Sequence, residues 1–219
     1  MDLTFWRERW RLNQIGFHQE GLNAHLMAFW ERLELSPNDP VFVPLCGKSR
    51  DMLWLRACGH SVLGVEVSEI AVRDFFAENG LQPRVSQRGP FAVWESDGIT
   101  LLCGDFFDLT SADLRDCTGV YDRASLVALP PAMRERYAGH LQMVLPRSTP
   151  ILLVTLEYPE GEMQGPPFTV TEEEVRAFYA TEFVCDRLYH LDVLAENPGL
   201  RQKGLSALVE KVYRLRRQP

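Results

Sequence analysis

Short apolar runs rich in β-branched residues alternate with amphipathic segments along the chain, and this alternation limits the fold more than any other feature. The apolar runs lie at residues 41–45, 61–67, 99–103, 119–123 and 151–156. Apolar residues at helical spacing mark segments at 52–58, 69–80 and 130–145. A further strand is expected at 85–94, followed by a hairpin turn at 96–98. Because strands that alternate with helices form crossover units, the pattern predicts a mostly parallel sheet with helices on both faces.

The two ends of the chain differ from this central pattern. Residues 3–35 carry apolar side chains at helical spacing, and a proline-rich turn follows them. Near the other end, residues 183–194 and 207–215 have the composition of strands. We therefore expect a Rossmann-like, doubly wound α/β fold whose seven-stranded sheet ends in an antiparallel pair of strands. Residues 1–219 would form one domain, in which residues 1–35 form a helical cover over the ligand site.

Charge and composition favour a small-molecule partner. The net charge of −7 disfavours binding to the phosphate backbone of nucleic acids. No stretch is long and apolar enough to span a membrane, so we expect no membrane partner. The five cysteines include no C-x-x-C pair, which indicates reduced thiols and a cytoplasmic location. The five histidines lack the spacing of metal ligands. No apolar stripe suited to a subunit interface is evident, so we expect a monomer. The histidine spacing leads us to expect no bound metal.

The loops after the parallel strands hold the candidate site, because ligands of open α/β sheets bind at the carboxyl ends of the strands. The first loop, residues 44–49, lacks the glycine patterns that bind dinucleotides or phosphates, but Gly47 lets the backbone approach a ligand closely. Glu66 ends the second strand, 19 positions after Gly47. A carboxylate at this position can accept hydrogen bonds from both hydroxyls of a ribose. The alternative is an exposed carboxylate at a strand end.

The third loop contains two residues suited to an adenine ring. Asp105 could accept a hydrogen bond from the exocyclic amino group, and Phe106 could cover one face of the ring. The alternative is a turn with two core aromatic residues, and Phe107 fits that description. Together with Glu66 and a first loop that holds no pyrophosphate, these residues indicate S-adenosylmethionine as the cofactor rather than a nicotinamide dinucleotide.

The fourth strand ends in Asp122 and Arg123. A guanidinium stays cationic and offers several donors, so Arg123 could hold a charged substrate or an anionic nucleophile. An internal salt bridge is the alternative role for this pair. Methyltransferases that act on nucleic-acid bases commonly carry an Asp/Asn-Pro-Pro-aromatic run at this point. Here Gly-Pro-Pro-Phe occurs at 165–168, after the fifth strand, so methylation of a base is disfavoured.

Five short runs, spread from near the N-terminus to the last third of the chain, occur together in few families. They are Phe-His-Gln-Glu at 17–20, Val-Pro-Leu-Cys-Gly-Lys at 43–48, Gly-His-Ser-Val-Leu-Gly-Val-Glu at 59–66, Tyr-Asp-Arg at 121–123 and Gly-Pro-Pro-Phe at 165–168. Together they resemble the thiopurine S-methyltransferase family of class I methyltransferases, in its bacterial branch. The resemblance implies contacts with S-adenosylmethionine at Trp10, Leu45, Glu66, Phe106 and Arg123.

The resemblance also implies a substrate pocket near Phe17 and Arg123, with Arg201 as the nearest candidate for a second substrate arginine. The implied reaction transfers a methyl group to the sulfur of aromatic or heterocyclic thiols such as thiopurines, by in-line displacement. Selenium and tellurium species are further acceptor candidates. We hypothesise that Arg123 holds the thiolate, or an acidic group beside it, while Asp122 orients Arg123.

Three other functions stay open on the sequence alone. The first is methylation of a halide, oxygen or nitrogen atom of another small molecule on the same scaffold. The second is a nucleotide-dependent oxidoreductase, against which the missing glycine fingerprint argues. The third is a binding module that retains the fold and the cofactor but catalyses nothing.

Overall fold

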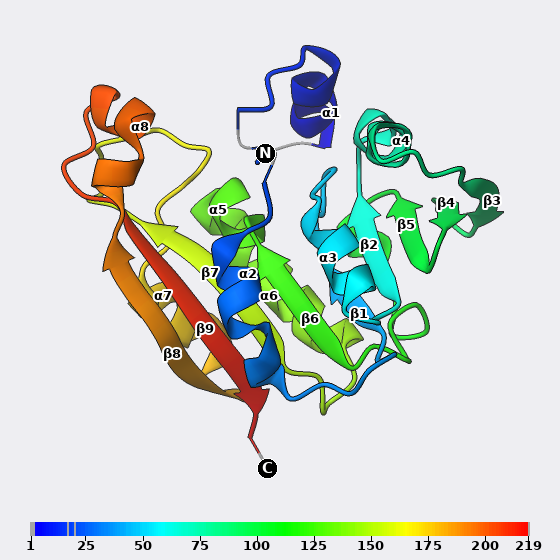
Figure 1. Ribbon diagram of the computed structural model, residues 1–219. Helices are drawn as coiled ribbons and strands as arrows, with labels where there is room; N and C mark the ends of the chain where they lie inside the picture. Colours follow the sequence, from blue (N-terminus) through cyan, green and yellow to red (C-terminus); the bar gives the residue numbers. More distant parts are fainter. Residues whose placement is uncertain (1–2, 17, 20, 219) are drawn as a thin grey trace.

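The computed structural model of the chain describes residues 3–16, 18–19 and 21–218. Within these residues the chain forms a nine-stranded sheet with the order β3-β4-β5-β2-β1-β6-β7-β9-β8 (Figure 1). The strands are β1 (Val41–Val43), β2 (Val62–Glu66), β3 (Arg84–Arg88), β4 (Phe91–Ser96), β5 (Ile99–Cys103), β6 (Gly119–Arg123), β7 (Ile151–Glu157), β8 (Phe183–Asp192) and β9 (Val209–Arg217).

The five central strands, β5-β2-β1-β6-β7, are parallel, as the alternation of strands and helices predicts. Strand β9 lies between β7 and β8 and is antiparallel to both, so the predicted antiparallel pair at the C-terminal end is confirmed. These seven strands match the expected sheet. The hairpin β3–β4 adds two antiparallel strands beside β5, which makes nine strands in place of the seven predicted.

The predicted strand at 85–94 is two strands instead of one. Gly89 has a φ of 55°, and with Pro90 it turns the chain between β3 and β4. Glycine adopts positive φ without steric cost, and proline donates no hydrogen bond to a sheet. Every residue of β3 is exposed, so no alternation of buried and exposed side chains marks it as a separate strand. The hairpin turn predicted at 96–98 is confirmed, since Ser96 pairs with Ile99 across it.

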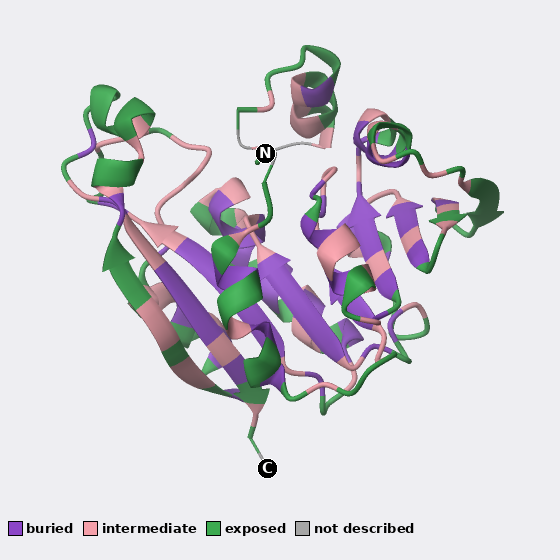
Figure 2. Cartoon of the chain, in the orientation of Figure 1, coloured by how far each residue is buried: buried purple, intermediate pink, exposed green. Residues whose placement is uncertain are grey.

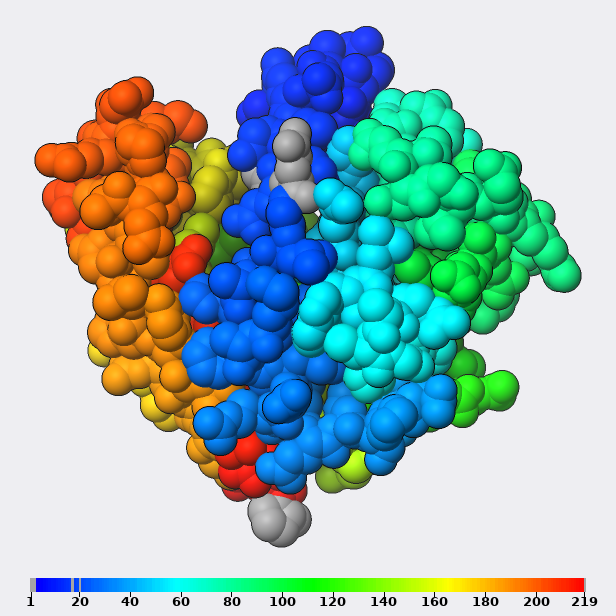
Figure 3. Space-filling view, in the orientation of Figure 1, coloured from blue at the N-terminus to red at the C-terminus, as the bar shows by residue number. Residues whose placement is uncertain are grey.

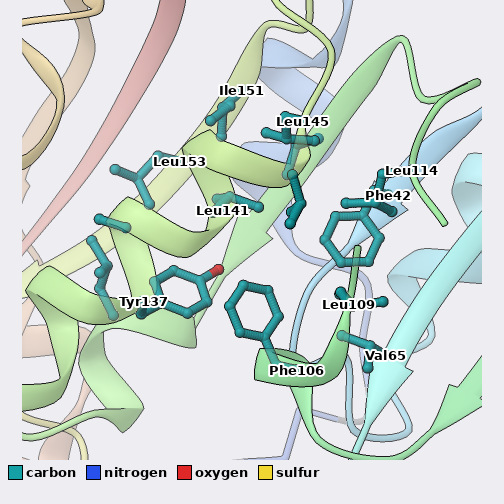
Figure 4. Close-up of a cluster of buried hydrophobic side chains, with 14 of the residues drawn as sticks. Phe42, Val65, Phe106, Leu109, Leu114, Tyr137, Leu141, Leu145, Ile151 and Leu153 are labelled. Atoms are coloured by element: carbon teal, nitrogen blue, oxygen red, sulfur yellow. The ribbon is translucent and has the colours of Figure 1, made fainter. Parts of the chain in front are cut away.

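Helices cover both faces of the sheet and enclose two buried apolar clusters. One face carries α2 (Ala24–Phe29), the 3-10 helix η1 (Trp30–Leu33), α3 (Asp51–Ala57) and α4 (Glu69–Glu78). The opposite face carries the 3-10 helix η2 (Phe106–Asp108), α5 (Ser125–Ala128), α6 (Pro131–Val144) and α7 (Glu172–Tyr179). Figure 2 shows that burial concentrates in the central strands, and Figure 4 shows part of the cluster between α6 and the sheet.

The N-terminal segment has two structural roles. Helix α1 (Leu3–Arg11) projects beyond the edge of the sheet beside α4 (Figure 1). Helices α2 and η1 instead pack on the sheet, where Leu26, Trp30 and Leu33 are buried. The side chain of Asn23 caps α2 by accepting hydrogen bonds from two backbone N–H groups of its first turn.

The connection between β8 and β9 contains the short helices η3 (Leu194–Glu196) and α8 (Pro198–Gln202), which project from the same edge of the molecule as α1 (Figure 1). A separate small apolar cluster supports this connection from below, formed by Tyr158, Val193, Leu205 and Leu208. Among the described residues, no helix has the length and apolar character needed to cross a membrane.

Candidate functional site

The parallel strands end at one edge of the sheet and bring four loops together there. Strand β1 lies between β2 and β6, so the chain leaves β1 toward one side of the sheet and later returns on the other side. This arrangement is the topological switch point at which open α/β sheets bind their ligands. The loops after β1, β2, β5 and β6 therefore surround one region, as the sequence predicts.

Glu66 lies at the centre of this region and joins the first two loops. One carboxylate oxygen, Oε2, accepts a hydrogen bond from the Gly47 N–H at 3.0 Å, and Oε1 accepts one from the Ser68 N–H at 2.8 Å. The side chain is buried, and this burial raises its pKa to about 7, against the opposing effect of the backbone hydrogen bonds. Glu66 is therefore an oriented, desolvated carboxylate and not the exposed strand-end residue of the alternative.

The first loop has an unusual backbone conformation. Leu45 and Gly47 have φ values of 45° and 52°. Positive φ is rare for a residue with a side chain, and such backbone strain concentrates at ligand sites. A Cβ at position 47 would lie 3.2 Å from Cζ2 of Trp10, so glycine is needed for conformation and for space. Trp10 is buried above this loop, and α1 is held there in part by a hydrogen bond from Arg7 Nε to the Val67 carbonyl at 3.4 Å.

An apolar pocket opens beside the second and third loops. It is lined by Leu3, Trp6, Leu45, Val67, Gly104, Asp105, Phe106, Phe107, Leu129, Met133 and Tyr137, and we call it the apolar pocket. Asp105 caps η2 through Oδ1, which accepts a hydrogen bond from the Phe107 N–H at 2.9 Å. Phe106 is buried, and its ring lies 4.7 Å from that of Tyr137 and 5.2 Å from that of His140. Leu45, Asp105 and Phe106 thus meet in one pocket, as predicted.

Two lining residues of the apolar pocket differ from the expectation from sequence. Phe107, for which a core position was expected, lines the pocket as Phe106 does. Tyr137 was not a candidate, because it lies in the middle of α6, far along the chain from the four loops. Only the packing of α6 against the sheet brings its ring to Phe106 (Figure 4).

Arg123 points to the face of the sheet that carries α3, where it has three partners. Its Nε donates to Asp51 Oδ2 at 3.0 Å, Nη1 donates to Gln19 Oε1 at 3.2 Å, and Nη2 donates to Ser49 Oγ at 3.3 Å. Only 14% of its side chain is exposed. The guanidinium is therefore oriented by the start of α3 and by the N-terminal segment.

The hypothesis that Asp122 orients Arg123 is wrong. Consecutive side chains of a strand point to opposite faces of the sheet, and Asp122 lies on the face away from Arg123. It is completely buried and accepts a hydrogen bond from the Tyr137 hydroxyl at 2.8 Å. Burial raises the pKa of Asp122 to about 6, although hydrogen bonds from Ser125 and Tyr137 act in the other direction. The internal salt bridge between the two neighbours is excluded for the same geometric reason.

Asp51 takes the position expected for Asp122. Its carboxylate is 1% exposed and accepts hydrogen bonds from Arg123, from the Tyr121 hydroxyl at 3.1 Å and from the Asn23 N–H at 2.9 Å. Sequence reasoning missed this residue. The available signal was an aspartate in the first turn of a helix that directly follows the glycine loop, but it could not be distinguished from an ordinary helix-stabilising acid.

Two predicted substrate residues were not placed against the site. Phe17 lies outside the described residues. Arg201 lies on α8 with an exposed side chain. Figure 3 shows α8 and the N-terminal segment projecting from the same side of the molecule with a hollow between them. Arg201 is not one of the residues that line the apolar pocket.

A second cavity, which we call the polar cavity, is formed mostly by the N-terminal segment itself. It is lined by Gln19, Gly21, Leu22, Asn23, Ala24, His25 and Glu210. Gln19 belongs to this lining and also bonds to Arg123, so the polar cavity adjoins the Arg123 cluster. Among the residues that the structure describes, no group of three His, Cys, Asp or Glu side chains could hold a metal ion.

Comparisons with known proteins identify the family of the chain and agree with its fold. A family model described as thiopurine S-methyltransferase matches residues 1–218. The thiopurine S-methyltransferase of Nitrosospira multiformis is 51% identical over 98% of both chains. That of Pseudomonas paraeruginosa is 54% identical over 99% of this chain and 100% of the relative. The crystal structure of Burkholderia thailandensis 1,6-didemethyltoxoflavin-N1-methyltransferase with S-adenosylhomocysteine shares the fold, with a TM-score of 0.67 and 14% identity over 99% of this chain and 87% of that one.

Proposed function

The chain belongs to the thiopurine S-methyltransferase family, and on that premise we propose that it methylates the sulfur of small aromatic or heterocyclic thiols. The methyl donor is S-adenosylmethionine. The observation that carries the proposal is the convergence of Glu66, the Gly47 loop and the apolar pocket at the switch point of the sheet. A carboxylate can bind the hydroxyls of a ribose, a glycine lets the backbone approach the ligand closely, and an aromatic-lined pocket can hold an adenine ring.

The residues at this edge fit the cofactor. Glu66 presents a buried, oriented carboxylate to which ribose hydroxyls can donate. Asp105 uses Oδ1 for its cap, and Oδ2 is suited to accept from an adenine amino group. Phe106 and Leu45 line the pocket from two sides, and Trp10 lies over Gly47. When bound, S-adenosylmethionine supplies a methyl group already activated by its positively charged sulfur.

For the acceptor, the protein must hold a sulfur nucleophile in line with that methyl group and keep water away. We assign the first task to Arg123. The three hydrogen bonds to Asp51, Gln19 and Ser49 use three of the five N–H donors of a guanidinium. The remaining donors and the fixed positive charge can hold a thiolate or an acidic group beside it. Asp51 is the residue that orients Arg123 for this purpose.

We assign the exclusion of water to the N-terminal segment within a single domain that spans residues 1–219. Helix α1 places Trp10 above the Gly47 loop, and Leu3 and Trp6 complete the lining of the apolar pocket. Segments of this kind sequester a reaction when they close over a ligand. Residues 24–33 hold the segment to the sheet, so residues 1–35 combine a cover with its anchor.

We further propose that the protein acts as a cytoplasmic monomer on a small molecule and not on nucleic acid. The net charge of −7 supports the absence of a nucleic-acid partner. All five cysteines are free, and burial raises the pKa of the Cys46 and Cys117 thiols, which makes them unreactive. Free, unreactive thiols are compatible with a reducing compartment.

Isothermal titration with S-adenosylhomocysteine tests the cofactor site. We expect micromolar binding, and we expect Glu66→Ala to weaken it about 10- to 100-fold, because charge-assisted hydrogen bonds to a ribose are lost. Glu173→Ala, an exposed glutamate on α7, is the matched control and should bind as the wild type does. Turnover is then followed with a thiopurine. Cofactor binding without any methylation would contradict the enzymatic proposal and indicate a binding module.

A further inference from the structure

His25 and Glu210 form a hydrogen-bonded pair in the wall of the polar cavity. His25 lies in the first turn of α2, and Glu210 lies near the start of β9. The distance between His25 Nε2 and Glu210 Oε2 is 2.6 Å. The His25 side chain is 10% exposed and that of Glu210 is 27% exposed, so both are mostly shielded but reachable from the cavity.

The periodicity of the strands places this pair on the same face of the sheet as Arg123. Tyr121 and Val212 both belong to the buried cluster below α2 and α3. Side chains two positions apart in a strand point the same way, so Arg123 and Glu210 also point to that face. Arg123 lies opposite Val154 of β7, and Glu210 lies opposite Leu156 of the same strand. Both residues are therefore at the carboxyl edge of the sheet, separated by the width of β7.

Gln19 connects the pair to the Arg123 cluster. Its Oε1 accepts from Arg123 Nη1, and the same residue lines the polar cavity with His25 and Glu210. Gln19 thus links the cavity wall that holds an imidazole and a carboxylate to the fixed positive charge of Arg123.

The surroundings of His25 fix its orientation. A carboxylate can only accept hydrogen bonds, so Nε2 of His25 carries a hydrogen atom and donates to Glu210. In the neutral imidazole this tautomer places the lone pair on Nδ1. The ring packs against Tyr189 of β8, with 4.6 Å between ring centroids, and against Phe29 of its own helix at 6.3 Å. The next residue of β9, Lys211, points to the other face of the sheet and is paired with Glu157 at 2.6 Å. Glu210 is the charged partner of the imidazole.

We propose that His25, oriented by Glu210, accepts the proton of acceptor thiols that are still protonated at neutral pH. The inference rests on the proposed function and extends it to the proton-transfer step. The S–H bond breaks, the proton moves to Nδ1 of His25, and the negative charge of Glu210 stabilises the imidazolium. The thiolate forms a bond to the methyl carbon, and the electron pair of the breaking carbon–sulfur bond passes to the leaving sulfur. His25 then returns its proton to water.

This arrangement predicts which acceptors depend on His25. An aliphatic thiol has a pKa near that of cysteine, about 8.5, and is mostly protonated at pH 7. A nitro-substituted thiophenol is already ionised at that pH and needs no base. If His25 accepts the proton, the effect of replacing it therefore depends on the pKa of the thiol that is methylated. A structural role would affect both acceptors equally.

The test compares kcat/KM for 2-mercaptoethanol and for 4-nitrothiophenol in wild type, His25→Gln and Glu210→Gln, with saturating S-adenosylmethionine at pH 7. We expect His25→Gln to lower the value for the aliphatic thiol about 100-fold and that for the nitrothiophenol less than about threefold. Glu210→Gln should give a smaller change with the same selectivity, because it alters only the orientation and charge support of the ring. His190→Gln, an exposed histidine on β8, is the matched control and should change neither value.

Titration with S-adenosylhomocysteine and the thermal midpoint verify that each variant is folded. Equal losses for both thiols in His25→Gln and Glu210→Gln would overturn the inference and assign the pair to the attachment of α2 to β9. Unchanged rates for both thiols would overturn it as well. If the wild type binds S-adenosylhomocysteine but methylates neither thiol, the proposed function itself fails, and this outcome is distinct from the other two.

Discussion

The apolar pocket takes its lining mainly from the loops after β1, β2 and β5 and from α6, whereas the polar cavity takes its lining from Gln19, from residues 21–25 and from β9. The first is formed by aromatic and aliphatic side chains with one carboxylate, Asp105. The second is formed mostly by polar residues and contains an imidazole paired with a carboxylate. Arg123 bonds to Ser49 of the first loop and to Gln19 of the polar cavity, so it links the glycine loop to the cavity.

This difference suits the apolar pocket to the methyl donor and the polar cavity to the methyl acceptor. A methyl donor that must bind anew in every turnover needs a preformed pocket on rigid strands and loops, and the apolar pocket has these features. A methyl acceptor needs groups that hold and deprotonate its nucleophile, and the polar cavity contains His25, which we propose as the proton acceptor, and adjoins the Arg123 cluster through Gln19. The N-terminal segment contributes to both sites, through Trp6 to the first and through His25 to the second.

The largest effect is expected at Arg123, where the two sites meet. Arg123→Ala should lower kcat at saturating substrates about 100- to 1000-fold, because a preorganised cation near the nucleophile is lost. The affinity for S-adenosylhomocysteine should fall far less. Steady-state kinetics combined with isothermal titration measures both quantities. Arg147→Ala, an exposed arginine after α6, is the control and should change neither.

The same measurements distinguish the two neighbouring aspartates. Asp51→Asn removes the charge that orients Arg123, so it should lower kcat in the same direction as Arg123→Ala. Asp122→Asn leaves the contacts of Arg123 intact and should act on stability more than on kcat. If Arg123→Ala loses affinity for S-adenosylhomocysteine and turnover to the same extent, the role of Arg123 toward the methyl acceptor is contradicted, and Arg123 belongs to the cofactor site alone.

The next effect is on stability and contrasts the linings of the two sites. Phe106→Ala removes a buried ring that packs on Tyr137 and His140, and it should lower the free energy of unfolding by about 3 kcal/mol. Leu22→Ala removes a side chain of the polar cavity that is 41% exposed, and it should cost about 0.5 kcal/mol or less. Urea denaturation measures both values. Similar losses for the two variants would show that the polar cavity is as rigidly packed as the apolar pocket.

The smallest change in function is expected in the pH dependence of cofactor binding. The folded-state pKa of Glu66, about 7, is above its ordinary value of 4.5. The folded protein therefore holds this proton more tightly than the unfolded chain, and the free energy of unfolding decreases as pH rises from about 4.5 to 7, by about 3 kcal/mol. Ribose hydroxyls donate to the ionised carboxylate, so affinity for S-adenosylhomocysteine should rise about tenfold between pH 6 and 8.

Two variants separate the contributions to this pH dependence. Glu66→Gln should abolish the rise in affinity, because an amide does not titrate. Asp122→Asn removes a second buried carboxyl with a raised pKa, about 6, and should flatten the stability profile without changing the pH dependence of binding. Calorimetric titration and denaturation at several pH values measure these effects. A rise in affinity that persists in Glu66→Gln would assign the titration to another group.

The local sequence by itself determined the parallel core of the sheet and the cofactor loops. Hydrophobic runs and turn residues are local signals, and a loop that follows a buried strand must emerge at the edge of the sheet. For this reason Gly47, Glu66, Asp105 and Phe106 could be named from the sequence and are found together. The exposed strand β3 was missed as a separate element because no buried face gave it a pattern.

Only the tertiary structure decided which side chains meet across the site. Asp122 and Arg123 are adjacent in sequence but point to opposite faces of β6, so the partner of Arg123 is Asp51, 72 positions away. His25 and Glu210 are 185 positions apart and meet because β9 inserts between β7 and β8 while α2 packs on the same face. Such contacts depend on strand order and on the face to which each side chain points. A single sequence states neither, because both result from how the whole sheet assembles.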